Sequence, residues 1–185
     1  MMPTQSMSHP MEMFGYTEHA LMVPPFAPAD VLILGQGRGT VSGLIKHVWG
    51  EQVKIMGVDL LIPPNESFDD YWEGDANKFV TKYCVKTYDF VVVDLYNGKL
   101  IPLFVFEEEF IEALARITRK LLAVNHTFYT MESMKVYGKY FVPDAVKTVN
   151  KDHVLFLTPK HLMDRMKETN GKEKAEEAEI LTQAR

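Results

Sequence analysis

The chain has 185 residues, 46% of them hydrophobic, so it can bury one substantial core. Its formal net charge of −5 argues against nucleic acid as a partner. Its single cysteine, Cys84, excludes an intrachain disulfide and a cysteine-cluster zinc site, and we expect it to be a small residue at the core edge. No apolar run reaches the roughly 20 residues of a membrane span and the first residues lack a secretory-signal pattern, so we expect a cytoplasmic protein without a membrane partner.

The composition along the chain predicts one domain with two irregular ends. Residues 1–15 carry Pro, Ser and Met without periodicity and are expected to be a flexible lead-in. Residues 161–185 are dominated by Lys and Glu and are expected to form a charged tail. The domain itself is assigned to residues 16–160.

The domain begins with a strand and a helix. Residues 30–34 (DVLIL) form a short apolar run typical of a buried strand. Residues 40–49 carry apolar side chains at helical spacing from Val41 to Val48, which predicts an amphipathic helix.

The turn between them, GQGRGT, is rich in glycine. Such a turn after a strand leaves backbone N–H groups that a ligand can approach without meeting a Cβ atom. The glycines Gly35, Gly37 and Gly39 give G-x-G-x-G, and Thr40 stands where the dinucleotide fingerprint has Gly or Ala. No G-K-[ST] follows to indicate a P-loop. The turn therefore predicts a nucleotide-class ligand without specifying which one.

Acidic residues follow the next predicted strands. Residues 53–60 form a strand that includes Asp59, near the roughly 20-residue distance at which nucleotide-binding units place a ribose-contacting carboxylate. Residues 88–95 form a second strand that includes Asp94. Asp75 precedes a helix predicted over residues 76–83.

A helix is predicted over residues 106–122, and the acids at 107–109 suit its first turn, so no metal role is assigned to them. A strand over residues 121–129 follows. Residues 145–149 and 153–157 predict a terminal β-hairpin.

This order predicts a Rossmann-like, doubly wound α/β fold, with a mostly parallel sheet and an antiparallel C-terminal hairpin. In such sheets ligands bind beyond the carboxyl ends of the strands. The glycine turn, Asp59, Asp75 and Asp94 all fall at that edge.

Residues 29–158 resemble the class I S-adenosylmethionine-dependent methyltransferases. Four stretches are more specifically similar to the spermidine synthase superfamily: YTEHALMVPPF running into VLILGQGRGTVSGLIKH, then GDANKFV, YDFVVVDLYNG and VNKDHVLFLTP.

The resemblance implies a role for each site residue. The donor, S-adenosylmethionine or its decarboxylated form, would be held by Gly35, Gln36, Gly37, Arg38, Gly39, Asp59, Asp75 and Ala76. Asp59 would bind the ribose, and Asp75 with Ala76 would meet the adenine. Asp94 would take the acceptor's proton, with Tyr16 and Asn97 near the acceptor. Small-molecule partners are implied, and a homo-oligomer is left open.

Three departures from the synthase pattern bear on the reaction. Arg38 replaces an aspartate, and a guanidinium pairs with the carboxylate that only intact S-adenosylmethionine carries. Asn97 replaces a second acid and cannot neutralise a polyamine. The segment 60–74 is too short for both a helix and a strand of ordinary length, which leaves the adenine side trimmed or open.

Two alternatives stand beside methyl transfer. The chain could be a Rossmann-fold binding or assembly module without catalysis, or it could transfer an aminopropyl group from the decarboxylated donor. Each site residue also has a structural interpretation: Asp59 and Asp94 as strand ends, Asp75 as a helix N-cap and Arg38 as a surface cation.

Overall fold

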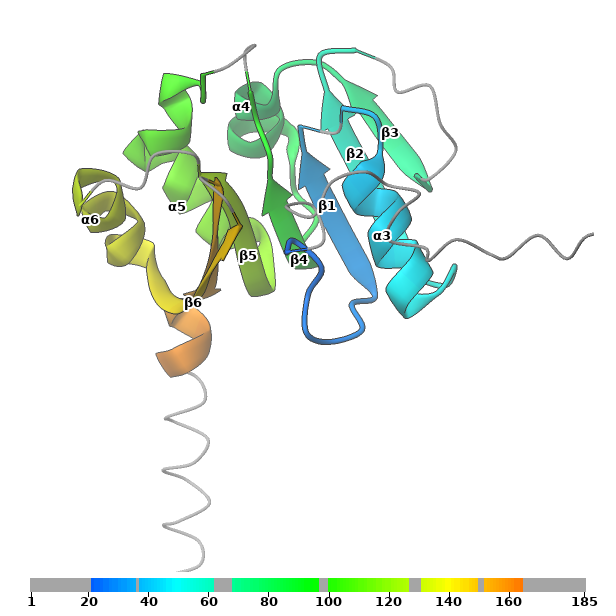
Figure 1. Cartoon of the computed structure of the whole chain (residues 1–185). Coiled ribbons are helices and arrows are strands. Elements are labelled where there is room, and N and C mark those ends of the chain that lie inside the picture. Colours follow the sequence, from blue (N-terminus) through cyan, green and yellow to red (C-terminus); the bar gives the residue numbers. More distant parts are fainter. Residues whose placement is uncertain are drawn as a thin grey trace, which may run out of the picture.

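The computed structural model describes residues 21–35, 37–61, 68–96, 100–126, 131–149 and 152–164 (Figure 1). The predicted ends at 1–15 and beyond residue 164 lie outside these ranges, and residues 160–164 are helical. Within the described ranges, no helix combines the length and apolar character needed to cross a membrane.

Seven strands of the described chain form one sheet, in the order β3-β2-β1-β4-β5-β7-β6. Their bounds are β1 Asp30–Leu34, β2 Lys54–Asp59, β3 Asp70–Glu73, β4 Tyr88–Val93, β5 Thr118–His126, β6 Phe141–Val149 and β7 Asp152–Pro159. The first five strands are parallel, whereas β7 is antiparallel to both β5 and β6. This arrangement confirms the predicted fold class.

The helical segments cover both faces of the sheet. They are α3 Thr40–Trp49, α4 Ala76–Lys78 with the π-helix η1 Phe79–Tyr83, the 3-10 helix η2 Leu103–Phe106, α5 Glu108–Ile117 and α6 Met131–Tyr140. In Figure 1, α3 lies against one face, and α4, α5 and α6 lie toward the other.

Alternation along β1 explains why two cores form. Val31 and Ile33 pack in the cluster that contains α3, while Leu32 and Leu34 pack in the cluster that contains α5. Successive side chains of a strand point to opposite faces, so a run of apolar residues supplies both layers. One sequence prediction is only partly correct here: Val48 was assigned to the apolar face of its helix but is 51% exposed.

The helix predicted over residues 106–122 is wrong at its C-terminal end. α5 ends at Ile117 and β5 begins at Thr118, whose hydroxyl donates a hydrogen bond to the Leu114 carbonyl at 2.7 Å. Leu121 and Leu122 pack in different clusters, as neighbours on a strand do. The spacing from Ile117 to Leu121 fits a helix too, and strand pairing decided the outcome.

Two further elements differ from the sequence analysis. The short segment 60–74 does contain a strand, β3, and its four residues pair in parallel with β2. The helix α6 was not predicted at all. Its sequence contains Gly138 and mixes polar with apolar residues, so its helical pattern is weak. Packing against α5 and η2 stabilises the helix instead.

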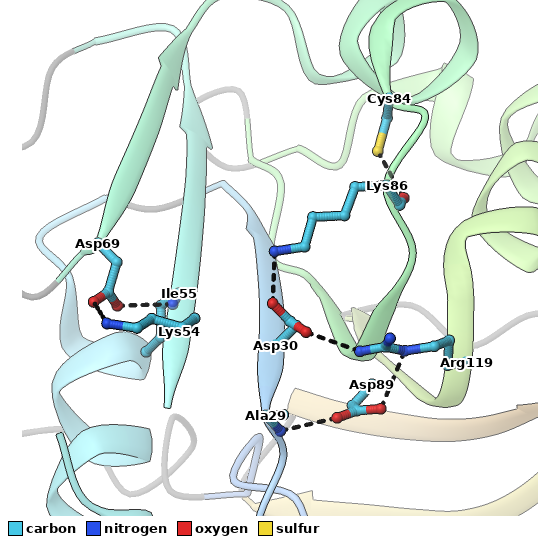
Figure 2. Close-up of polar contacts among 9 residues, drawn as sticks. All are labelled: Ala29, Asp30, Lys54, Ile55, Asp69, Cys84, Lys86, Asp89 and Arg119. Atoms are coloured by element: carbon cyan, nitrogen blue, oxygen red, sulfur yellow. Dashed lines mark hydrogen bonds and ion pairs between the residues drawn. The ribbon is translucent and has the colours of Figure 1, made fainter. Parts of the chain in front are cut away.

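An ion-pair network fastens the amino ends of β1, β4 and β5 (Figure 2). Asp30 pairs with Lys86 at 2.5 Å and with Arg119 at 3.0 Å. Asp89, whose side chain is 8% exposed, accepts the Ala29 N–H at 2.9 Å and pairs with Arg119 at 3.2 Å. These bonds tie three neighbouring strands together at the edge opposite the ligand-binding edge of such sheets.

The network lowers the pKa of both carboxyl groups. The hydrogen bond from Lys86 is the largest influence on Asp30. Burial alone would raise the pKa of Asp89, but the Ala29 N–H, Arg119 and Lys120 together outweigh it. Near this network, Cys84 is buried, burial raises its pKa, and its thiol lies 3.4 Å from the Lys86 carbonyl oxygen, as expected of a core-edge residue.

We expect Asp89→Asn to lower the free energy of unfolding at pH 7 by about 1–3 kcal/mol, because Arg119 loses a charged partner. The pKa of Asp89 is depressed in the folded state, so its contribution is present above the unfolded value of about 3.9 and is lost as pH falls below it. Urea unfolding at pH 7 and at pH 3 measures both effects.

The variant should therefore differ from the parent protein more at pH 7 than at pH 3. Asp144→Asn, at an exposed position on β6, is the matched control and should change stability little. An equal loss at both pH values would contradict the electrostatic role of Asp89.

Candidate functional site

A cavity of about 500 Å³ lies at the carboxyl edge of the parallel strands, within the roughly 300–1,000 Å³ range of small-molecule sites. It is lined by Gly35, Gly37, Arg38, Thr40, Val41, Asp59, Leu60, Gly74, Asp75, Ala76, Asp94, Leu95, Tyr96, Pro102 and Phe104. These residues follow β1, β2, β3 and β4. The chain passes from β3 at one edge to β4 beside β1, and this reversal of strand order is where α/β sheets bind ligands.

The glycine turn adopts the left-handed backbone that its sequence predicts. Gly35, Gly37 and Gly39 have φ values of 85°, 51° and 77°. A Cβ atom at Gly35 would lie 2.1 Å from the carbonyl oxygen of Asp94. Glycine at position 35 therefore lets β1 and β4 leave the sheet side by side, which brings the turn close to the acid after β4.

Asp59 joins the end of β2 to the glycine turn. Its Oδ2 accepts the Gly37 N–H at 2.9 Å, and its Oδ1 accepts the Leu60 N–H at 2.7 Å. A carboxylate accepts up to about four hydrogen bonds, so both bonds are compatible with an added ribose hydroxyl. Asp59 thus shapes the turn as well as lining the cavity.

Tyr71 on β3 supports the segment that follows Asp59. Its hydroxyl donates to the carbonyl oxygen of Leu61 and lies 3.4 Å from that of Asp59. Burial raises the pKa of Tyr71 to about 12, with smaller contributions from Asp59 and Glu73. The phenol is therefore a hydrogen-bond donor at neutral pH.

Asp75 is a helix N-cap, as its structural interpretation predicts, and it also lines the cavity. Its Oδ1 accepts the Asn77 N–H at 2.8 Å at the start of α4. Ala76 is buried beside it and lines the cavity too. The predicted adenine contacts thus lie on the β3 side of the cavity.

Asp94 is held by a side chain from the next strand. Its Oδ1 accepts a hydrogen bond from Asn125 Nδ2 at 2.8 Å. Asn125 is 7% exposed, and within the described part of the chain its Oδ1 is buried without a hydrogen-bond partner. Asn125 falls within the strand predicted over residues 121–129, and in the structure it is the second-to-last residue of β5.

An apolar wall completes the cavity on the β4 side. Leu95 and Tyr96 follow Asp94 directly, and Pro102 with Phe104 comes from the segment before α5. Of these four residues, the sequence pointed only to Leu95, which ends the strand predicted over residues 88–95, and to Tyr96 directly after it. The other two reach the cavity through the packing of α5 and α6.

The apolar wall is fixed from behind. The Phe104 ring packs edge-on against Phe110 at a centroid distance of 5.1 Å. Val105 is fully buried, and its carbonyl accepts a hydrogen bond from the Tyr137 hydroxyl at 3.0 Å. Burial raises the pKa of Tyr137, so this hydroxyl donates throughout the ordinary pH range. Helix α6 thereby positions one wall of the cavity.

The structure brings together most of the site residues that the sequence predicted. Gly35, Gly37, Arg38, Asp59, Asp75, Ala76 and Asp94 line the cavity. Gly39 is instead the buried N-cap residue of α3, and its carbonyl accepts bonds from Gly43 and Ser42. Tyr16, Gln36 and Asn97 lie outside the described residues. The roles assigned to all of them stay predictions.

Comparisons with known proteins identify the fold. No protein-family model matches the sequence, and no curated protein matches it either. Among solved structures, the chain is similar to 1,6-didemethyltoxoflavin-N1-methyltransferase of Burkholderia thailandensis, whose crystal structure contains bound 1,6-didemethyltoxoflavin and S-adenosylhomocysteine. The TM-score is 0.58 at 13% identity, over 77% of each chain.

Two other solved structures illustrate the range of the fold. A probable spermidine synthase from Corynebacterium glutamicum gives a TM-score of 0.53 at 17% identity, over 70% of this chain and 55% of that one. Human N-acetylserotonin methyltransferase, in complex with S-adenosylmethionine, gives 0.53 at 12% identity, over 77% and 51%. The chain therefore has the Rossmann-like fold of class I S-adenosylmethionine-dependent methyltransferases, which spermidine synthases share.

We expect Gly35→Ala to lower the free energy of unfolding by more than Gly37→Ala. Both variants pay about 1–2 kcal/mol for a left-handed backbone. Only at position 35 does the new Cβ also meet the Asp94 backbone, whereas at position 37 it comes within 4 Å of none of the described residues beyond its chain neighbours. Equal losses in urea unfolding would contradict the close approach of β1 and β4.

Proposed function

We propose that this chain binds S-adenosylmethionine in the cavity and transfers its methyl group to a small-molecule acceptor. One observation carries the proposal: the glycine turn, Asp59, Asp75 and Asp94 follow four different strands and line a single cavity. They do so in a sheet with the methyltransferase fold. A cavity assembled from distant segments is better explained by a ligand than by four independent turns.

The lining residues suit the three parts of the donor. Arg38 offers a guanidinium to the donor's carboxylate. Asp59 accepts hydrogen bonds from the ribose hydroxyls, and Asp75 with Ala76 lies beside the adenine. Among the described residues beyond its chain neighbours, none lies within 4 Å of a Cβ placed at Gly37, so this part of the turn can be approached closely by a ligand.

The reaction needs little beyond binding and orientation. Bound S-adenosylmethionine supplies an electrophilic methyl group, whose carbon–sulfur bond breaks toward sulfur as the acceptor's lone pair bonds to the carbon. Asp94 accepts the proton that the acceptor nitrogen or oxygen gives up and passes it to water. Asn125 holds the Asp94 carboxylate in place at 2.8 Å. The apolar wall keeps water from the reacting atoms, and alignment of the two substrates supplies most of the acceleration.

Arg38 distinguishes this proposal from aminopropyl transfer. The decarboxylated donor presents an ammonium and no carboxylate at this end, and a guanidinium repels it. We therefore propose intact S-adenosylmethionine as the ligand.

We expect Arg38→Ala to weaken binding of S-adenosylhomocysteine by roughly three- to thirtyfold, since an exposed charge-assisted hydrogen bond is lost. Binding of 5′-methylthioadenosine, which has the same nucleoside without the amino-acid part, should not change. Isothermal titration calorimetry on the full chain measures both, with Lys82→Ala, an exposed residue outside the cavity, as the matched control.

Tighter binding of decarboxylated S-adenosylmethionine than of the intact donor would overturn the argument from Arg38. If the intact donor, its decarboxylated form and S-adenosylhomocysteine all fail to bind, the non-catalytic binding module becomes the better interpretation of the fold.

We expect Asp94→Asn to reduce methyl transfer by roughly 100-fold or more while leaving affinity for S-adenosylhomocysteine nearly unchanged. Asparagine keeps an oxygen that accepts the Asn125 hydrogen bond, so the fold around it is preserved. Transfer is measured as labelled methyl incorporated into small-molecule, protein and RNA fractions of a cell extract. Glu112→Gln, exposed on α5, is the control. Lost donor affinity would instead make Asp94 a donor ligand.

A further inference from the structure

The two sides of the cavity differ in chemistry. The residues that follow β1, β2 and β3 include Arg38, Asp59 and Asp75, which are charged. The residues on the β4 side are Leu95, Tyr96, Pro102 and Phe104, with Asp94 at the border. The charged side is the one assigned to the donor, so the apolar wall is left to the acceptor.

From this division we infer that the acceptor is a small molecule with a flat, apolar ring system and a single nucleophilic nitrogen or oxygen. A polyamine does not fit the same site. The inference rests on the proposed methyl transfer and concerns only its second substrate.

The aromatic side chains of the wall favour a ring. Phe104 is held rigidly by its contact with Phe110 and by the buried residue Val105 that follows it. A preorganised aromatic surface gains stacking energy from a flat ligand without losing much side-chain entropy. Tyr96 is 38% exposed and stands at the mouth of the same wall.

The acceptor side of the cavity offers little negative charge to a polyamine. Each ammonium group that leaves water needs an anionic partner, because an unpaired buried charge is costly. Among the described residues of the apolar wall and its border, Asp94 supplies the sole carboxylate. Asp59 and Asp75, which also line the cavity, lie with Arg38 on the side assigned to the donor. Asp94 can pair with one basic or nucleophilic group of the acceptor, whereas a second ammonium would have no carboxylate partner on this wall.

The rim of the cavity is also apolar. Leu60 lines the cavity with 69% of its surface exposed, and Leu100 and Leu103, beside Pro102, are 69% and 81% exposed. Large apolar side chains exposed together around a cavity mark a site that meets an apolar ligand.

The inference is tested by binding of defined probes to the full chain saturated with S-adenosylhomocysteine. We expect isoquinoline and 2-naphthol, which carry one ring nitrogen and one hydroxyl, to bind more tightly than putrescine and spermidine. Tyr96→Ala should weaken 2-naphthol by roughly three- to tenfold, since one aromatic contact is lost. Saturation-transfer NMR and calorimetry measure the affinities.

Tyr83→Ala is the matched control, because Tyr83 is an exposed tyrosine that does not line the cavity. It should leave the affinity for 2-naphthol unchanged, and neither variant should alter binding of S-adenosylhomocysteine. Tighter binding of putrescine, or undiminished binding of 2-naphthol to Tyr96→Ala, would overturn the inference. So would labelled methyl found only in protein or RNA.

The test separates the two proposals. Failure of S-adenosylhomocysteine to bind would refute the proposed function, and with it the acceptor assignment that rests on it. Normal binding of S-adenosylhomocysteine together with a preference for putrescine would refute only the assignment of the acceptor.

Discussion

The close approach of Gly35 to the backbone of Asp94 is the contact on which the site depends. A side chain at position 35 would meet the Asp94 carbonyl, so only glycine lets the ends of β1 and β4 run together. The Gly35 N–H also bonds the Val58 carbonyl at 2.9 Å on the other side. The turn is thus clamped between β2 and β4, which fixes both the backbone of the turn and its distance to the acid that follows β4.

The chemical character of the cavity lining changes with the order of the strands. Charged residues that line the cavity lie at or just after the ends of β1, β2 and β3, whereas the residues after Asp94 on the β4 side are apolar or aromatic. A ligand with a carboxylate, a ribose and a base matches the first group, and a flat nucleophile matches the second. The boundary between them is Asp94, which Asn125 orients. In the proposed reaction, the group that accepts the proton would therefore lie between the two substrates.

Stability and ligand binding are assigned to opposite ends of the same strands. At the amino ends, Asp30 and Asp89 bind cations from neighbouring segments, and these bonds hold the sheet together at the edge opposite the cavity (Figure 2). At the carboxyl ends, polar side chains instead form hydrogen bonds within turns and line the cavity. Helix α6 links the two functions, because Tyr137 is part of the core and also fixes the wall that holds Phe104.

The sequence by itself determined the fold class, the glycine turn and the acids at strand ends, because strand periodicity and glycine backbone chemistry are local properties. Tertiary structure decided what depends on distant partners. Strand pairing ended α5 at Ile117, and packing against α5 created α6, whose sequence has little helical pattern of its own. The position of Pro102 and Phe104 in the apolar wall could not be predicted from the sequence either, because it depends on the packing of helices that come later in the chain.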